Sequence, residues 1–243
     1  MTHQLRSEIL KLRTTSTTAV LLLAAAGLTL LAVFLEGLPP TVRDLAKEST
    51  QREMFSAVTS AVLFATFAGV IAVTSEFRYG TIRPTVLIEP RRRVVLGAKL
   101  VAAAMIGVAF GVVCVGIAFG AGISLLALRG VDVGLTGTHT LTLVLGSIAV
   151  SALSAMLGVA VGTLIRNQAG AIVAVVAYSV AVDATLFASV PTFGRWLPGK
   201  AGDALIGLPK DELLTPAAGA LVLLVWTVAF AVAATLRDDR TDV

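Results

Sequence analysis

The chain has 243 residues and a formal net charge of +4, and 56% of its residues are hydrophobic whereas only 14% are charged. Soluble domains carry about 25% charged residues, so a globule of this composition could not cover its own surface with polar groups. Six spanning helices of roughly 20 residues would use about half of the chain and leave no room for a soluble catalytic domain. These properties predict an all-α integral membrane protein and argue against an enzyme.

The elements expected in chain order are one amphipathic helix and six spans. Residues 2–13 are predicted to lie in the headgroup plane, because Leu5, Ile9 and Leu12 recur at helical spacing. The first span could instead be a secretory signal, but its apolar core is long and five more spans follow. The third is long enough to tilt or to extend beyond the bilayer. The predicted spans are residues 18–35, 54–74, 98–128, 140–165, 169–190 and 216–236.

The basic residues predict the orientation of the spans. Twelve of the 19 lysines and arginines lie at the termini, in the loop of residues 75–97, at Lys99 and at Arg166, and seven lie in the loops of the other side. The positive-inside rule then places both termini in the cytoplasm, as an even number of spans requires. Because these residues cluster at membrane edges without interleaved aromatics, they favour contact with membrane lipids and do not indicate nucleic acid. The Ala-, Val- and Gly-rich spans point to a bacterial plasma membrane.

The loop of residues 75–97 contains features that the orientation of the spans in the membrane does not require. Gly80 and Pro84 interrupt it, and an apolar run, residues 85–88, stands between charged residues. Apolar residues framed by arginine and glutamate are typical of a surface that seats against another protein. Three successive arginines, residues 91–93, follow this run. They could attract anionic lipid or contact a partner protein.

Three segments resemble the membrane subunits of ABC-2 type transporters. They are SEILKLRTT at residues 7–15, EFRYGTIRPTVLIEPRRRVVLGAKL at residues 76–100 and LGVAVGTLIRNQAGAI at residues 157–172. In that family the first is a connecting helix, the second is the loop that holds the coupling helix, and the third is the turn between spans four and five. With the six spans, the resemblance covers essentially the whole chain, residues 1–243, as a single transmembrane domain.

The resemblance implies an exporter driven by a separate ATPase. Two membrane subunits, either identical copies or paralogues, would pair, and each would engage one ATPase subunit through a coupling helix at residues 80–88. This chain would bind no cofactor, and ATP and Mg²⁺ would be held by the partner. The cargo range of the family is apolar or amphipathic: a drug, a lipid or a peptide. The implied ATPase-coupling residues are Glu76, Gly80, Thr81, Arg83, Pro84, Val86, Leu87 and Ile88.

Polar residues inside the spans are candidates for a pathway or a gate. Asp183 lies about seven positions below the end of the fifth predicted span, and a carboxylate at that depth is costly unless it is paired or hydrated. It could contact substrate, form a gating ion pair, or lie at a wet interface if the span ends early. Tyr178 lies in the same span. Three serines share one face of span four and could line a pathway or serve helix packing: Ser147, Ser151 and Ser154.

The other motifs in the sequence do not indicate a nucleotide site or a metal site. Residues 194–200 match GxxxxGK, but Ala201 follows where a P-loop needs Ser or Thr, so no nucleotide site is expected there. Instead, residues 193–208 are expected to form short interfacial helices on the outer side, with Trp196 at headgroup level. His3, His139 and Cys114 are isolated in the sequence, which predicts no metal site. Two alternatives to the exporter remain open at this point, an ion-coupled secondary transporter and a membrane scaffold or sensor subunit.

Overall fold

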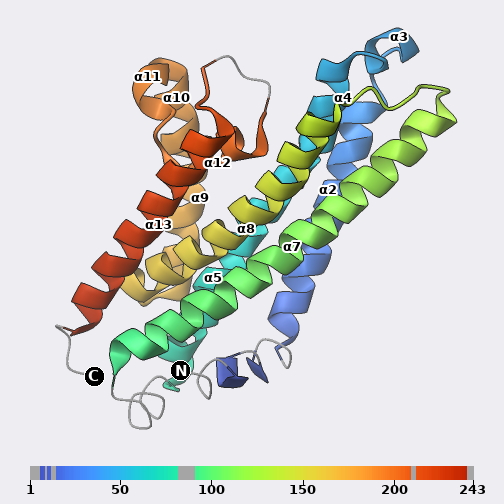
Figure 1. Ribbon diagram of the computed structural model, residues 1–243. Coiled ribbons are helices and arrows are strands. Elements are labelled where there is room, and N and C mark those ends of the chain that lie inside the picture. Colours follow the sequence, from blue (N-terminus) through green and yellow to red (C-terminus); the bar gives the residue numbers. More distant parts are fainter. Residues whose placement is uncertain (1–5, 9, 12–14, 82–90, 209–211, 240–243) are drawn as a thin grey trace.

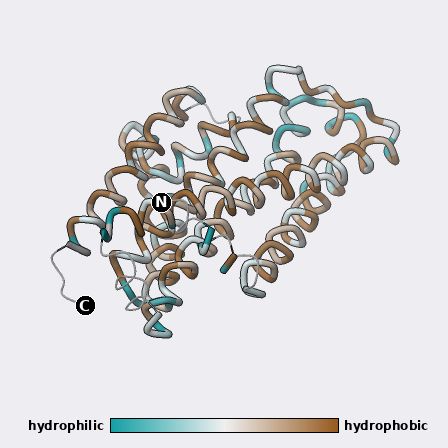
Figure 2. Tube along the Cα trace, turned by 60° about the horizontal axis from the view of Figure 1, so that its bottom comes forward, coloured by the Kyte–Doolittle hydropathy of each residue, from teal (hydrophilic) through white to brown (hydrophobic). Residues whose placement is uncertain are grey.

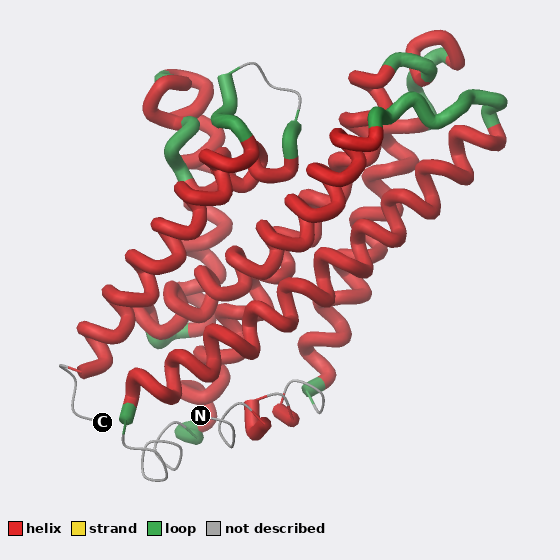
Figure 3. Tube along the Cα trace, in the orientation of Figure 1, coloured by secondary structure: helices red, strands yellow, loops and turns green. Residues whose placement is uncertain are grey.

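The computed structural model describes residues 6–8, 10–11, 15–81, 91–208 and 212–239. Helices account for nearly all of this part of the chain, and the described residues contain no strand (Figure 3). Six helical segments are long and apolar enough to cross a membrane. The predicted fold class, an all-α integral membrane protein with six spans, is confirmed. Residues 6–8 and 10–11 are helical, which covers the described part of the expected amphipathic helix.

The helices follow the predicted order with three differences in detail. The second span starts earlier than predicted, because the polar helix α4 (Glu48–Phe55) and a 3₁₀ turn lead directly into α5 (Ser60–Tyr79). The third span, α7, is 37 residues long. The fifth contains a π-helical turn, η2, between α9 and α10. The elements are α2 (Ser16–Gly37), α3 (Val42–Leu45), α4 (Glu48–Phe55), η1 (Ser56–Thr59), α5 (Ser60–Tyr79), α7 (Arg92–Leu128), α8 (Gly137–Ile165), α9 (Gln168–Ala177), η2 (Tyr178–Asp183), α10 (Ala184–Ser189), α11 (Pro191–Gly194), α12 (Pro198–Ile206) and α13 (Pro216–Asp239).

Three inner spans form the centre of the bundle (Figure 1). Helices α5, α7 and α8 are 44 to 56% buried along their apolar windows, whereas α2, the α9–α10 span and α13 are 11 to 22% buried. Figure 2 shows hydrophobic residues along the whole length of the helices, with hydrophilic ones mainly at their ends and in loops. A helix that is apolar all round and poorly buried needs lipid or another protein around it.

Glycines set the spacing of the inner spans. A Cβ at Gly69 or Gly158 would collide with backbone atoms across the α5–α8 contact, and one at Gly107 would collide with the backbone of α8. Small residues of this kind let membrane helices approach closely. By contrast, a Cβ at Gly116 or Gly120 would meet nothing within 4 Å, although these residues form an equally spaced pair on α7.

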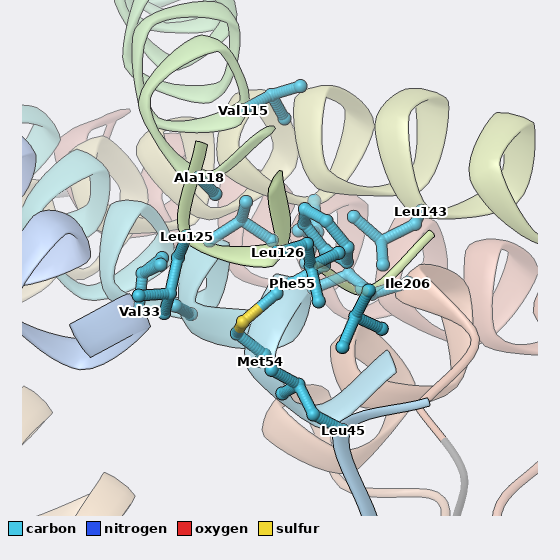
Figure 4. Packing of buried hydrophobic residues seen from close by; sticks show 14 of the residues in the cluster. Val33, Leu45, Met54, Phe55, Val115, Ala118, Leu125, Leu126, Leu143 and Ile206 are labelled. Atoms are coloured by element: carbon cyan, nitrogen blue, oxygen red, sulfur yellow. The ribbon is translucent and has the colours of Figure 1, made fainter. Parts of the chain in front are cut away.

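The two ends of the bundle differ in construction. We call the end at which α5 stops and α7 starts the lower end, and the opposite end, with α3, α11 and α12, the upper end, as drawn in Figure 1. The upper half of the inner spans packs around Phe55, which stacks on Phe119 with ring centroids 4.7 Å apart (Figure 4). Gln51 stabilises the loops above this core, donating to the carbonyls of Leu45 and Asp132.

Candidate functional site

A cavity of about 480 Å³ lies between the inner spans and the fifth and sixth spans. Its walls come from α5, α8, α9, α12 and α13, and most of its lining is apolar. The space extends from the start of α12 to Ile165, the last residue of α8. Volumes of about 300 to 1,000 Å³ with a few polar groups are typical of small-molecule sites. Aromatic side chains on the sixth span, Trp226 and Phe230, contribute to the wall.

The upper end of this cavity is acidic. Asp183 and Asp203 both line it, and no lysine or arginine is among the described residues of its lining. The Asp183 side chain is 8% exposed, and the Tyr178 hydroxyl donates to it at 3.4 Å. Lys200 lies beside the cavity, with its Nζ 2.8 Å from Asp203 Oδ2 and 3.5 Å from Asp183 Oδ2. We call Asp183, Lys200 and Asp203 the upper charge cluster.

Local helix geometry brings the upper charge cluster together. The π-turn η2 ends at Asp183, and after α10 prolines begin the short helices α11 and α12, at Pro191 and Pro198. Proline suits the first helical turn, where its missing N–H has no intrahelical partner. Helix α12 thereby returns against the fifth span, and its Gly199 lies so close to the Asp183 carboxyl that a Cβ there would collide with it. Asp183 is thus buried and paired within the protein.

Burial and the neighbouring carboxylates have opposite effects on the pKa of Lys200. Burial alone would lower the pKa of its ammonium group, but the hydrogen bond to Asp203 and the charges of both aspartates outweigh burial and raise the pKa above 10.5. Lys200 therefore stays protonated at neutral pH. Its ammonium group lies within 3.5 Å of a carboxylate oxygen of both Asp183 and Asp203.

A second charge cluster closes the lower end of the bundle. Lys99 Nζ, at the start of α7, lies 2.5 Å from Glu76 Oε1 on α5 and 3.1 Å from Glu8 Oε1 in the N-terminal helix. Lys11 Nζ lies 2.9 Å from Oε1 of both glutamates. We call these four residues the lower charge cluster. The Lys99, Glu76 and Glu8 side chains are 4 to 7% exposed.

Among the described residues, this lower charge cluster pairs two lysines with two carboxylates. Burial alone would lower the pKa of Lys11, but hydrogen bonds to Glu8 and Glu76 and the charges of these residues raise it above 10.5. The cluster joins the two helices that flank residues 82–90 to the N-terminal helix. Glu76 was expected in the coupling set, but its partners were not predicted. Complementary charges at the same membrane edge were the available signal.

A family model for ABC-2 family transporter proteins matches residues 4–182 of the chain. The chain belongs to this family. A comparison with curated proteins found no match. As an ABC-2 family protein, the chain is a multi-pass membrane permease of an ABC-type transporter and is its transmembrane component, as the sequence predicted. The matched region contains four complete spans and most of the fifth and ends within η2, whereas the cavity of this permease is completed by α12 and α13 outside that region.

Three of the eight predicted ATPase-coupling residues lie in the described part of the chain. Glu76 lies in the lower charge cluster, and Gly80 ends α5 in a left-handed conformation with φ of 69°, where a residue without a Cβ is favoured. Thr81 follows it and is exposed. The other members fall outside the described residues: Arg83, Pro84, Val86, Leu87 and Ile88.

The predicted pathway residues separate into two groups in the permease. Asp183, Tyr178 and Ser154 line the cavity. Ser147 and Ser151 are buried elsewhere. Ser147 donates to the carbonyl of Leu143, and the backbone of both serines lies where Gly107 and Gly111 of α7 approach α8. Their surroundings are those of helix packing.

Two further segments of the permease are the stretch that resembles a P-loop and the turn between α8 and α9. The segment that resembles a P-loop, residues 194–200, follows a short helix and runs into α12, and Lys200 is engaged by aspartates. The expected short helices in residues 193–208 are α12 and the end of α11. Trp196 is 48% exposed, and its carbonyl accepts a hydrogen bond from Trp226 Nε1. At the turn between α8 and α9, Arg166 has a φ of 57° and stacks over Phe77.

Proposed function

We propose that this permease is the membrane subunit of an ATP-driven exporter and works as a dimer with two separate ATPase subunits. It binds no cofactor itself, and ATP and Mg²⁺ are held by the ATPase. Both termini lie in the cytoplasm of a bacterial cell, so the lower end of the bundle faces the ATPase. The cargo is apolar or amphipathic, such as a drug, a lipid or a peptide.

The lower charge cluster is the observation that supports this mechanism. Residues 82–90, which include most of the predicted coupling helix, connect α5 to α7, and Glu76 and Lys99 bond these two helices to each other close to the loop. A force applied to the loop therefore reaches two inner spans together. Since α5 and α8 are in tight glycine-mediated contact, a displacement of α5 also moves α8. Closure of the ATPase pair would bias the bundle between two arrangements in this way.

The poorly buried outer spans support the dimer. The α9–α10 span is 11% buried, and its large apolar side chains are exposed, among them Val173 and Val180. Lipid alone could cover this surface, but in a dimeric permease part of it would contact the second subunit. The second subunit is either an identical copy or a paralogue.

The experiment is reconstitution with an ABC ATPase whose gene lies beside that of the permease. We expect cargo-stimulated ATP hydrolysis in vesicles and its loss in Arg83→Glu and Leu87→Asp, which change the predicted coupling helix. Leu128→Asp is the matched control, because Leu128 is 85% exposed at the other end of α7. Normal efflux and normal ATPase co-purification in both coupling variants would contradict the proposal.

A further inference from the structure

The cavity between the inner spans and the fifth and sixth spans is long and narrow. Its lining residues on α8 form one stripe with helical spacing: Val150, Ser154, Leu157, Val161 and Ile165. At a rise of about 1.5 Å per residue, this stripe is about 22 Å long. A volume of about 480 Å³ over that length gives a space roughly 5 Å across. Because carbon atoms in contact lie about 3.5 to 4.0 Å apart, the space admits one hydrocarbon chain and not two side by side.

The cavity is closed at its upper end and open toward the membrane. Helix α12 lies at the upper end (Figure 1), and its buried lining residues Gly202 and Ile206 close the cavity there. By contrast, Ala174 and Ser179 line the cavity and are exposed on the fifth span. A ligand therefore reaches the cavity from within the bilayer.

One hydroxyl group in the lining has no partner within the described part of the chain. Thr66 and Ser179 also line the cavity, and each donates to a carbonyl oxygen four residues earlier. Ser154 is 5% exposed and forms no hydrogen bond with a described residue. A buried hydroxyl group without a partner is costly. Ser154, near the upper end of the stripe, therefore offers a hydrogen bond to a polar group of the ligand.

The polar head of the ligand need not carry a charge. Asp183 accepts a hydrogen bond from the Tyr178 hydroxyl, and its Oδ2 lies 3.5 Å from Lys200 Nζ. The same ammonium group lies 2.8 Å from Asp203 Oδ2. Because these side chains are engaged with one another, a neutral head with hydroxyl groups suits this end of the cavity and costs less to bury than an ion.

The part of the stripe below Ser154 has the length of a lipid chain. From Ser154 to Ile165 it runs about 16 Å, and half of the hydrocarbon core of a bilayer is about 15 Å thick. We propose that the cavity binds a neutral single-chain amphiphile, with its hydroxylated head beside Ser154 and Tyr178 and its chain along α8 toward Ile165. Lipid tails are as apolar as the cavity walls, so binding gains from closer packing and from the hydrogen bond. That this amphiphile is the cargo rests on the proposed function, whereas its binding does not.

The probe is a monoacylglycerol whose chain of about 16 carbon atoms, the length of one leaflet, carries a photoreactive diazirine at its middle. The purified full chain is reconstituted into phosphatidylcholine vesicles without any ATPase, and mass spectrometry counts the adducts after illumination. We expect labelling that saturates at one adduct per chain and maps to Leu157, Val161 or Phe230 in the lining. Labelling of the outer surface of the bundle rises in proportion to the probe and does not saturate.

Unlabelled competitors test the shape of the site. A monoacylglycerol of the same chain length should compete as well as the probe binds. One with half that length should compete about tenfold less well, because it forms fewer packing contacts. Diacylglycerol should also compete about tenfold less well, because the cavity admits one chain. Equal competition by diacylglycerol would assign the site to ordinary bilayer lipid and would overturn the proposal.

Ser154→Ala tests where the head lies. It should weaken labelling by the monoacylglycerol about fivefold, because one hydrogen bond is lost. Labelling by hexadecane with the same diazirine should not change, because an alkane has no head. Ser147→Ala is the matched control, since Ser147 is buried in the same helix, donates to Leu143 and does not line the cavity. An equal loss for both probes in Ser154→Ala would overturn the placement of the head.

A size change tests the chain independently of the head. Ala174→Phe adds a ring inside the cavity lining and should abolish the saturable labelling. Ala177→Phe makes the same change one turn further along the fifth span, at an exposed residue outside the lining, and should leave labelling unchanged. Size-exclusion profiles and circular dichroism identify any variant that fails to fold.

Two further results would overturn the inference. They are labelling that does not saturate and equal labelling of Ala174→Phe and Ala177→Phe. If saturable labelling fails while the reconstituted complex still shows cargo-stimulated ATP hydrolysis, only this inference is wrong. If the probe binds as expected but no ATPase responds to the permease, the site stands and the proposed export function fails.

Discussion

The upper and lower charge clusters lie at opposite ends of one bundle and differ in how their buried carboxylates are paired. Both bury carboxylates in an apolar protein, where an unpaired charge is costly. The lower cluster matches two lysines to two glutamates and touches no described cavity lining. In the upper cluster one lysine lies beside two aspartates, and both aspartates line a cavity. The lower cluster therefore holds helices together at one end of the bundle, whereas the upper cluster also forms part of a cavity wall.

The largest expected effect is at the lower cluster. Lys99→Met would leave two buried carboxylates with one half-exposed lysine, and breaking a buried pair typically costs about 3 to 5 kcal/mol. We expect a loss of this size in the free energy of unfolding, measured by denaturant titration in detergent. The double variant Lys99→Met/Glu76→Gln leaves the Glu8–Lys11 pair and should recover part of the loss. If the double variant were no more stable than the single one, charge balance would not be the cause.

Lys200→Met should cost less stability, about 2 kcal/mol. Its side chain is 14% exposed, so water screens part of the repulsion between the two aspartates that remain. The same titration measures it. An equal loss in Lys99→Met and Lys200→Met would erase the distinction between the two clusters.

Lys11→Met should have a smaller effect, about 1 kcal/mol or less. The Lys11 side chain is 43% exposed, so its bonds to Glu8 and Glu76 are screened by solvent. Thermal unfolding of this variant beside Lys99→Met separates the two lysines of one cluster. A loss as large as that of Lys99→Met would mean that the outer lysine, and not the buried one, balances the glutamates.

Alkaline pH should produce the smallest change. The folded-state pKa values of Lys11 and Lys200 are raised above 10.5, so the stability that they contribute is complete below that value and is lost as the pH rises through the raised pKa. We expect unfolding titrations at pH 9 and pH 11 to differ more in the native chain than in Lys11→Met or Lys200→Met. Identical differences in all three proteins would show that neither lysine carries the effect.

Hydropathy sufficed to predict the six spans, because each needs only a long apolar run. It could not predict the start of the second span, since polar residues such as Glu48 continue the helix above the apolar part. Asp183 lies within the fifth span, but its burial depends on α12 returning against η2, which no local pattern encodes. The lower cluster joins Glu8 to Lys99 across 91 positions, and only the packed bundle brings them together. The glycine pairs were visible in the sequence, yet their spacing could not distinguish packed Gly107 from open Gly116.

The π-turn at Tyr178–Asp183 gives the fifth span a place where one residue can be lost without rotating the rest of the helix. Such a turn accommodates one residue more than an α-helical turn of the same height. Deleting a single residue from it would let the backbone close into a regular α-helix, and the residues above would keep their orientation because the turn had absorbed the extra residue. The same deletion in the regular helix α9 would rotate everything above it by about 100°, and the Asp183 carboxylate would turn away from α12. One lost codon there would leave the span apolar enough to insert but would separate Asp183 from its partners.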